Sequence, residues 1–459
     1  MSDWPAAMGD QMPPQLLTDD EMSRFIRDGF VTVMSTLDRA FHDDVWSETD
    51  RAFTEDGNPG NNLIPRFPHI QRVLDDAPVQ GALISLLGPD YYAQPHRHPH
   101  ANPPGSPGQQ MHQDGGRRWS HRTRRLLVFY YPQDTPEEIG PTGVVPGSHF
   151  YSTQDGAALE AELPVVGQAG AVTLANYDLW HRAMPNLGNR TRYMLKFLYA
   201  RMSEPSQPTW DAADPVGGAP AHGMEARSLA WHYGAPSDDH ASAGQGQADL
   251  LARLDGSDEG DALQAAYSLS DLGPAVVDAL ATTLVGDSEN AARNASHALT
   301  AIGAPAVGAV ADALDHERPE VRARAAETLG DMGMAAAESV PRLVDAARDG
   351  DASARRYAVE ALGTTAQGTA AATQTLAGAL ADDDERVRRN AVLSLARIGR
   401  DAEGAEPALV SALTDESRYV RADAAHALRR IGTPEANDTL LEFLTVARWC
   451  PDTSPRSTH

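Results

Sequence analysis

The chain has 459 residues, more than one hydrophobic core usually organises, so at least two domains are expected. Its formal net charge of -26 disfavours a nucleic-acid partner, because that affinity depends on lysine and arginine neutralising phosphates. Cys450 is the only cysteine, which excludes an internal disulfide. No run approaches about 18 apolar residues, and the first residues lack the basic and apolar regions of a signal peptide. We therefore expect no membrane span and a cytoplasmic location.

The first predicted element is a helix that begins after Thr18. Thr18 and Glu21 have the spacing of a capping box, in which the two residues satisfy each other's free backbone N–H groups.

Three histidines alternate with other residues between Pro95 and His100. This run resembles a metal cluster, but it contains two prolines and no acidic partner. It also precedes the Gly- and Pro-rich segment 102–108, which favours a loop near the mouth of an active site over a metal site. Within the run, His98 is a candidate for substrate contact.

Residues 111–115 and 179–186 together fit one iron site. The first segment supplies His112 and Asp114, and the second supplies His181, which lies 67 residues beyond Asp114. Two histidines and one carboxylate bind non-haem Fe(II) on one face and leave the opposite positions open. Ligands two residues apart on an extended strand point to the same face, while the third must come from a separate strand. Taken alone, His-x-Asp recurs by chance, and His181 would be a core histidine.

A basic and aromatic stretch, from Arg117 to Arg122, follows the first two ligands. It either binds an anionic substrate or forms a solvated loop. Arg117 and Trp119 are its candidates for substrate contact.

Arg190 and Arg192 lie nine and eleven residues after His181 and lead into the strand-like run 193–199. A buried arginine can bind a carboxylate through two parallel hydrogen bonds, as the binding of 2-oxoglutarate requires. The alternative is a strand arginine in an ordinary structural ion pair.

From about residue 16 to 234, the chain resembles the phytanoyl-CoA dioxygenase family of Fe(II)/2-oxoglutarate oxygenases. Four segments carry this resemblance in the family's order. They are residues 17–31, which are similar to the family's opening helix and first strand, the segment around His112, residues 140–149 and residues 170–192. The resemblance implies a double-stranded β-helix, a cupin-like jelly roll, with flanking helices.

The resemblance assigns His112, Asp114 and His181 to Fe(II). It assigns Arg192 to the far carboxylate of the co-substrate 2-oxoglutarate, with Arg190 as the reserve candidate. Members often have a serine two residues after the distal histidine that helps to hold this carboxylate, whereas this chain has Ala183. Asp114 favours hydroxylation or a related oxidation, because relatives that halogenate have a small residue there. Dioxygen and a small-molecule substrate are the implied partners.

A different pattern recurs from about residue 247 to 446. Its markers end at equivalent positions 273, 303, 333, 366, 399 and 432, with periods of 30, 30, 33, 33 and 33 residues. Such periods indicate stacked supersecondary units. Apolar residues in 321–329 have helical spacing, and a second helical stretch follows near 340–344. Two short helices can bury their apolar faces only against neighbouring units. The pattern resembles an all-α HEAT-repeat solenoid, whereas an irregular helical bundle would not need a fixed period.

The resulting division places the oxygenase domain at 1–234, a polar linker at 235–246, the HEAT-repeat domain at 247–448 and a tail at 449–459. The repeat domain has 33 acidic and 19 basic residues, a net charge of -14. This charge favours a protein-binding or architectural surface over one that binds DNA.

Two functional classes remain. The first is an Fe(II)- and 2-oxoglutarate-dependent dioxygenase that hydroxylates a small or lipid-like metabolite, with the HEAT repeats as a scaffold or interaction arm. The second is a non-catalytic binding or scaffold protein that acts through its repeats. The complete ligand set favours the enzyme, because a pure scaffold needs none of these groups.

Overall fold

A computed structural model describes residues 12–115, 121–213, 223–234, 246–366 and 368–446. The chain divides into two compact units, which are described separately. The first comprises Met1–Arg201 and Gln207–Ala219, and the second comprises Met202–Ser206 and Pro220–Arg448. Of the linker expected at 235–246, only Gly246 is described, and the tail expected at 449–459 lies outside the described residues.

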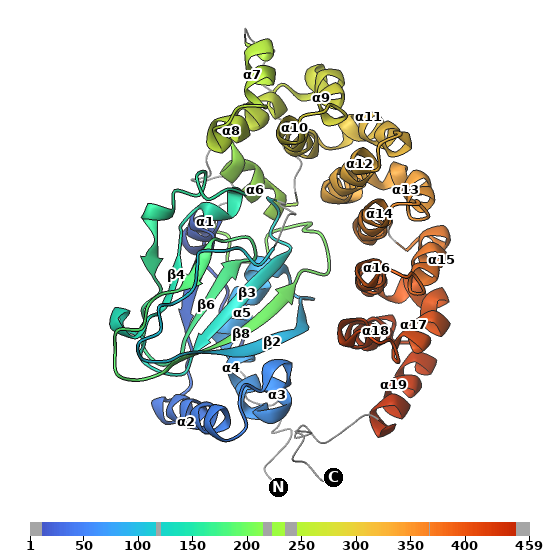
Figure 1. Ribbon diagram of the computed structural model, residues 1–459. Helices are drawn as coiled ribbons and strands as arrows, with labels where there is room; N and C mark the ends of the chain where they lie inside the picture. Colours follow the sequence, from blue (N-terminus) through green and yellow to red (C-terminus); the bar gives the residue numbers. More distant parts are fainter. Residues whose placement is uncertain (1–11, 116–120, 214–222, 235–245, 367, 447–459) are drawn as a thin grey trace. The chain divides into compact units, whose positions relative to one another are not determined.

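The first unit contains a five-stranded and a three-stranded antiparallel sheet (Figure 1). The large sheet has the order β1-β6-β3-β8-β2, and the small sheet has the order β5-β4-β7. The strands are β1 (Phe30–Met34), β2 (Tyr92–Asn102), β3 (Arg125–Tyr131), β4 (Thr142–Val144), β5 (Leu163–Pro164), β6 (Ala171–Asn176), β7 (His181–Ala183) and β8 (Arg192–Ala200).

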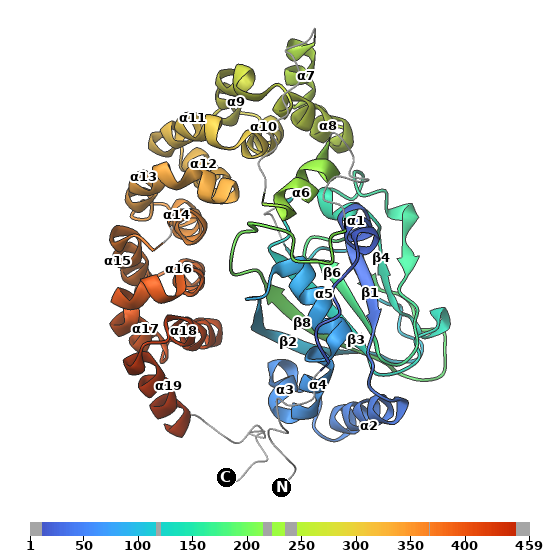
Figure 2. The same ribbon diagram turned by 180° about the vertical axis from the view of Figure 1, so that it is seen from behind.

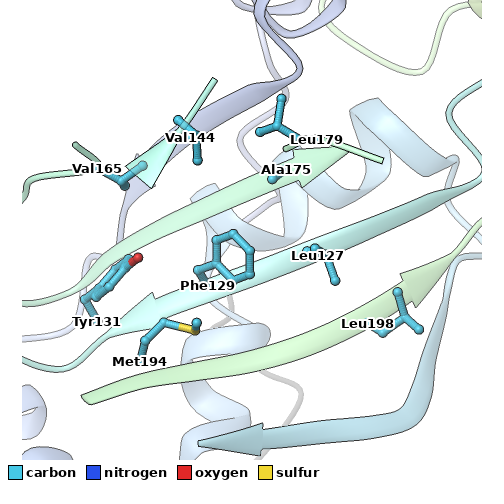
Figure 3. Packing of buried hydrophobic residues seen from close by; sticks show 9 residues of the cluster. All are labelled: Leu127, Phe129, Tyr131, Val144, Val165, Ala175, Leu179, Met194 and Leu198. Carbon is cyan, nitrogen blue, oxygen red and sulfur yellow. The ribbon is translucent and has the colours of Figure 1, made fainter. Parts of the chain in front are cut away.

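The core of this unit lies between the two sheets. Alternate residues of β3 and β8 point to the same side and meet Val144 of β4 in one apolar cluster (Figure 3). On β8 this inward side carries Met194 and Leu198, and the same alternation therefore places Arg192 and Lys196 on it. This arrangement confirms the expected jelly roll.

Five helices flank the large sheet. They are α1 (Asp19–Asp28), α2 (Arg39–Glu55), α3 (Leu63–Arg66), α4 (Gln71–Leu74) and α5 (Ala77–Leu87). Figure 2 shows α5 in front of the sheet, and α5 contacts both β1 and β6. The predicted capping box is present, because Thr18 Oγ1 accepts from Glu21 N and Glu21 Oε2 accepts from Thr18 N.

The histidine run between Pro95 and His100 was expected to form a loop, and this expectation is wrong. The run belongs to β2, which pairs with β8 along most of its length. The two prolines misled the prediction, because they remove backbone donors that a central strand needs. They are tolerated here since β2 is an edge strand with a register irregularity between Ala93 and Arg97.

The second unit is all-helical in the part that the structure describes. Two layers of helices run through it, with α12, α14, α16 and α18 stacked in one layer (Figure 1). The helices are α6 (Met224–His232), α7 (Gln247–Arg253), α8 (Glu259–Ser270), α9 (Val277–Leu284), α10 (Glu289–Ile302), α11 (Val307–Asp312), α12 (Pro319–Met332), α13 (Val340–Ala346), α14 (Ala352–Thr365), α15 (Ala370–Ala379), α16 (Glu385–Ile398), α17 (Glu406–Ala412), α18 (Arg418–Ile431) and α19 (Pro434–Val446).

Helix α6 is attached to this helical unit. It contacts α8, and Arg227 on α6 pairs with Asp271 just after α8 at 2.6 Å. None of the described helices in the chain is long and apolar enough to cross a membrane.

The fixed period has two physical causes. The marker glycines, such as Gly303 and Gly399, end their helices at positive φ, a conformation that costs glycine little. Neighbouring repeats are also joined by half-buried arginine–aspartate pairs, each 27 residues apart. In each pair, the arginine also donates to two backbone carbonyls before its own helix. The pairs are Arg322–Asp349, Arg355–Asp382 and Arg388–Asp415.

Candidate metal centre

Backbone pairing brings the two candidate histidine ligands together. His181 begins β7, and His112 forms an antiparallel bridge with it, because each residue donates its N–H to the other's carbonyl at 2.9 to 3.0 Å. Residues paired in this way project their side chains to the same face of the sheet. The two imidazole centroids are 4.6 Å apart. His181 therefore lies on a separate strand alongside His112, as the sequence predicts for a third candidate ligand.

Asp114 completes a three-residue cluster. One ligand atom from each of His112, Asp114 and His181 lies within 4.8 Å of the others, and these are the only residues of the described chain that meet this criterion for a metal site. The Oδ1 atom of Asp114 is 3.9 Å from Nε2 of His112. His181 is buried and its ring lies 5.7 Å from that of Phe129, whereas the His112 side chain is partly open to solvent. The cluster thus has one enclosed side and one accessible side.

Local contacts fix the segment that carries His112 and Asp114. Between them, Gln113 points away and its Nε2 donates to the carbonyls of Tyr151 and Asp178. After them, Gly115 lies so close to Asp178 that an added Cβ would fall 1.7 Å from its Oδ1. A larger residue after Asp114 would therefore require the Asp178 side chain to move.

The electrostatics of the cluster favour metal binding at neutral pH. Burial lowers the pKa of His181 to about 4, so its imidazole is neutral and keeps a free lone pair. Burial opposes ionisation of Asp114, but Lys196, His181 and His112 together outweigh this effect and hold the pKa of Asp114 below its usual value. Imidazole nitrogens and a carboxylate are the donors that non-haem Fe(II) accepts.

Arg192 is the first residue of β8 and is 1% exposed. Its Nε donates to the Gly140 carbonyl at 2.9 Å, whereas its buried Nη1 has no hydrogen-bond partner among the described residues. Burial lowers the pKa of the Arg192 guanidinium, because its charged form loses hydration. A buried cation with a free donor fits a carboxylate ligand.

The other predicted residues lie in different settings. Arg190 precedes β8, is exposed and lies over the ring of Trp46 at 5.7 Å. Arg117 and Trp119 fall outside the described residues. His98 lies on β2 directly opposite Lys196 of β8, so its side chain shares the inward face of the large sheet.

Two residues on inward faces were not predicted from the sequence. Thr142 on β4 lies directly opposite Ala183 of β7, and its Oγ1 accepts a hydrogen bond from the Tyr131 hydroxyl at 2.6 Å. Lys196 is buried and donates to Asp114. A signal for Lys196 was present, because it lies four residues after Arg192 in an otherwise apolar strand and must share its face.

The fold and the cluster together define an oxygenase-type jelly roll with a candidate mononuclear metal centre, joined to a helical-repeat unit. Residues 13–194 match the family model described as phytanoyl-CoA dioxygenase, and residues 274–363, 307–396 and 376–449 match the model described as HEAT repeats. The N-terminal domain therefore belongs to the phytanoyl-CoA dioxygenase family of non-haem oxygenases, and the helical unit consists of HEAT repeats. Both expected resemblances are confirmed.

Solved structures resemble only part of the chain. The non-haem α-ketoglutarate-dependent carbocyclase SnoK from nogalamycin biosynthesis is 17% identical, with a TM-score of 0.35, and the match covers 42% of this chain and 88% of that one. The non-haem monooxygenase ThoJ, in a nickel complex, is 21% identical with a TM-score of 0.32, covering 40% and 80%. Apo HygX from Streptomyces hygroscopicus is 18% identical with a TM-score of 0.34, covering 40% and 87%. No curated protein matches the chain.

Proposed function

We propose that the N-terminal domain is an Fe(II)- and 2-oxoglutarate-dependent dioxygenase that hydroxylates a small or lipid-like metabolite. The observation that carries this proposal is the convergence of His112, Asp114 and His181 within 4.8 Å, on the inward side of a jelly roll of this family. When bound, Fe(II) and 2-oxoglutarate would supply the activation of dioxygen that oxidises an unreactive carbon.

The chain's own groups hold the metal in this proposal. Nδ1 of His112 donates to the Gln110 carbonyl and Nδ1 of His181 donates to the Leu179 carbonyl, each at 2.9 Å. A carbonyl oxygen only accepts hydrogen bonds, so these contacts place the proton on Nδ1 and leave Nε2 free for the metal.

The far carboxylate of 2-oxoglutarate is assigned to Arg192. Its Nη1 supplies a donor that is already dehydrated, so binding an anion there removes an existing cost of burial. The missing serine at Ala183 is replaced from the facing strand. The Thr142 hydroxyl oxygen accepts a hydrogen bond from Tyr131, so its own proton is free to be donated to the far carboxylate of 2-oxoglutarate. Arg190, exposed and stacked on Trp46, has no such role.

The HEAT repeats act as a scaffold or as an arm that binds a protein. Their net charge of -14 argues against a phosphate backbone as the ligand. A non-catalytic protein that acts only through the repeats is the competing function, and metal-dependent turnover distinguishes the two.

The experiment is an anaerobic titration of the full chain with Fe(II), followed by a measurement of succinate release from 2-oxoglutarate against a panel of metabolites. We expect one Fe(II) per chain and oxygen-dependent succinate. His181→Ala should abolish both, whereas His69→Ala, which removes a partly exposed histidine paired with Glu48, should change neither. Stoichiometric iron in the His181→Ala variant would remove the assignment.

A further inference from the structure

Lys196 is the only lysine in the chain, although lysine and arginine together number 38. We infer that Lys196 is a positioning residue for the metal centre: it holds one oxygen of Asp114, so that this carboxylate offers only its other oxygen to the metal. The inference rests on the proposed function and concerns how the carboxylate ligand is presented.

Lys196 lies in buried surroundings, where an ammonium group needs an anionic partner. It lies in the middle of β8, is 4% exposed, and is opposite Phe129 on β3 and His98 on β2. Its neighbours on the inward face of β8 are Met194 and Leu198, which Figure 3 shows on one side of the strand. An ammonium group in such surroundings needs a compensating anion. Its Nζ donates to Asp114 Oδ2.

The contact completes a regular arrangement around the cluster. Each of the three candidate ligands has a second polar atom that the protein holds: Nδ1 of His112 and Nδ1 of His181 are held by backbone carbonyls, and Oδ2 of Asp114 is held by Lys196. Partners of this kind orient metal ligands, and their loss typically weakens metal binding about 10- to 100-fold.

The two oxygens of Asp114 consequently have different tasks. Oδ1 faces His112 Nε2 at 3.9 Å, while Oδ2 is engaged by Lys196. Carboxylates bind metals through one oxygen or through both. With Oδ2 held, Asp114 occupies one coordination position, so a metal bound here would keep the remaining positions for the co-substrate and dioxygen.

The choice of lysine has a chemical reason. A guanidinium presents a rigid fork that matches both oxygens of a carboxylate, whereas an ammonium is a compact charge that can bond one oxygen. An arginine at this position would therefore compete with the metal for Oδ1. The other 37 of the 38 lysine and arginine residues are arginine, so a general preference for lysine in this sequence does not explain Lys196.

The test uses Co(II), which reports its coordination through its visible absorption, with the full chain and without 2-oxoglutarate. Lys196→Met should weaken Co(II) binding about 10- to 100-fold and alter the spectrum, because both oxygens of Asp114 become free. Lys196→Gln retains a neutral donor for Oδ2 and should remain within about tenfold of the wild type. Met194→Leu, on the same inward face, is the control for packing and should leave both readouts unchanged.

Several outcomes would overturn the inference. Unchanged binding and spectrum in Lys196→Met would remove the role, and tighter binding would mean that the ammonium only repels the metal. If Lys196→Met does not fold, Lys196→Gln is compared with Lys196→Arg. The glutamine variant should bind Co(II) more tightly than the arginine variant. Equal affinities, or tighter binding by the arginine variant, would contradict the inference. Failure of the wild-type chain to bind Co(II) would instead refute the proposed function.

Discussion

Replacing Arg192 with methionine should separate co-substrate binding from stability. The change removes the bond from Nε to the Gly140 carbonyl, which is worth about 1.5 kcal/mol. That carbonyl still accepts from Asn102 Nδ2 at 3.0 Å, so no buried acceptor is left without a partner. The change also removes the unpartnered Nη1, whose burial costs about 1 to 3 kcal/mol. The two effects nearly cancel, and the free energy of unfolding of the ligand-free protein should change by no more than about 2 kcal/mol.

Binding of 2-oxoglutarate should respond much more strongly. Truncating one partner of a buried, hydrogen-bonded charge pair costs about 2 to 5 kcal/mol. The dissociation constant should therefore rise from about 30-fold to several thousandfold. Thr142→Val, which removes only a hydroxyl beside the same carboxylate, should cost about 1 to 2 kcal/mol.

The assay is anaerobic calorimetry with 2-oxoglutarate on the metal-loaded protein, together with thermal unfolding of the ligand-free protein. Arg190→Ala is the matched control, because this exposed arginine should leave the dissociation constant unchanged. Wild-type affinity in Arg192→Met, or loss of affinity in Arg190→Ala, would refute the reasoning. Collapse of the ligand-free Arg192→Met protein would instead indicate a structural role for the guanidinium.

Two further predictions concern the HEAT repeats. Asp382→Asn should lower the free energy of unfolding by about 2 kcal/mol in urea titrations, because Asp382 accepts two charged hydrogen bonds from Arg355. The control is Asp383→Asn at the exposed neighbouring residue, which should stay within about 0.5 kcal/mol of the wild type. Those bonds hold the pKa of Asp382 below its usual value, so the stability that the ion pair contributes is present at neutral pH and is lost as the pH falls below about 4 through the lowered pKa. Asp382→Asn should flatten this acid dependence of stability. An unchanged dependence of stability on pH would contradict the argument. Two fragments, residues 247–448 and residues 220–448, should both give all-helical circular dichroism spectra. The longer fragment keeps α6 and its ion pair, so it should have the higher unfolding midpoint. Equal midpoints would count against a stabilising role for α6.

The sequence by itself determined which chemistry the chain could perform. His112, Asp114 and His181 were identified as candidate ligands because their residue types suit non-haem iron and because they lie in segments that resemble an oxygenase family in that family's order. The repeat unit was equally accessible, because each helix pair must bury its face against a neighbour and so repeats the same residues at a fixed period.

The tertiary structure decided where inward-facing polar residues meet. The run from Pro95 to His100 has the composition of a loop, and only its place at the edge of the large sheet allows it to be a strand. Thr142 and Lys196 belong to strands that are distant in sequence from Ala183 and Asp114, so nothing local indicated their pairing. Strand register, which depends on long-range backbone hydrogen bonds, brings these groups together.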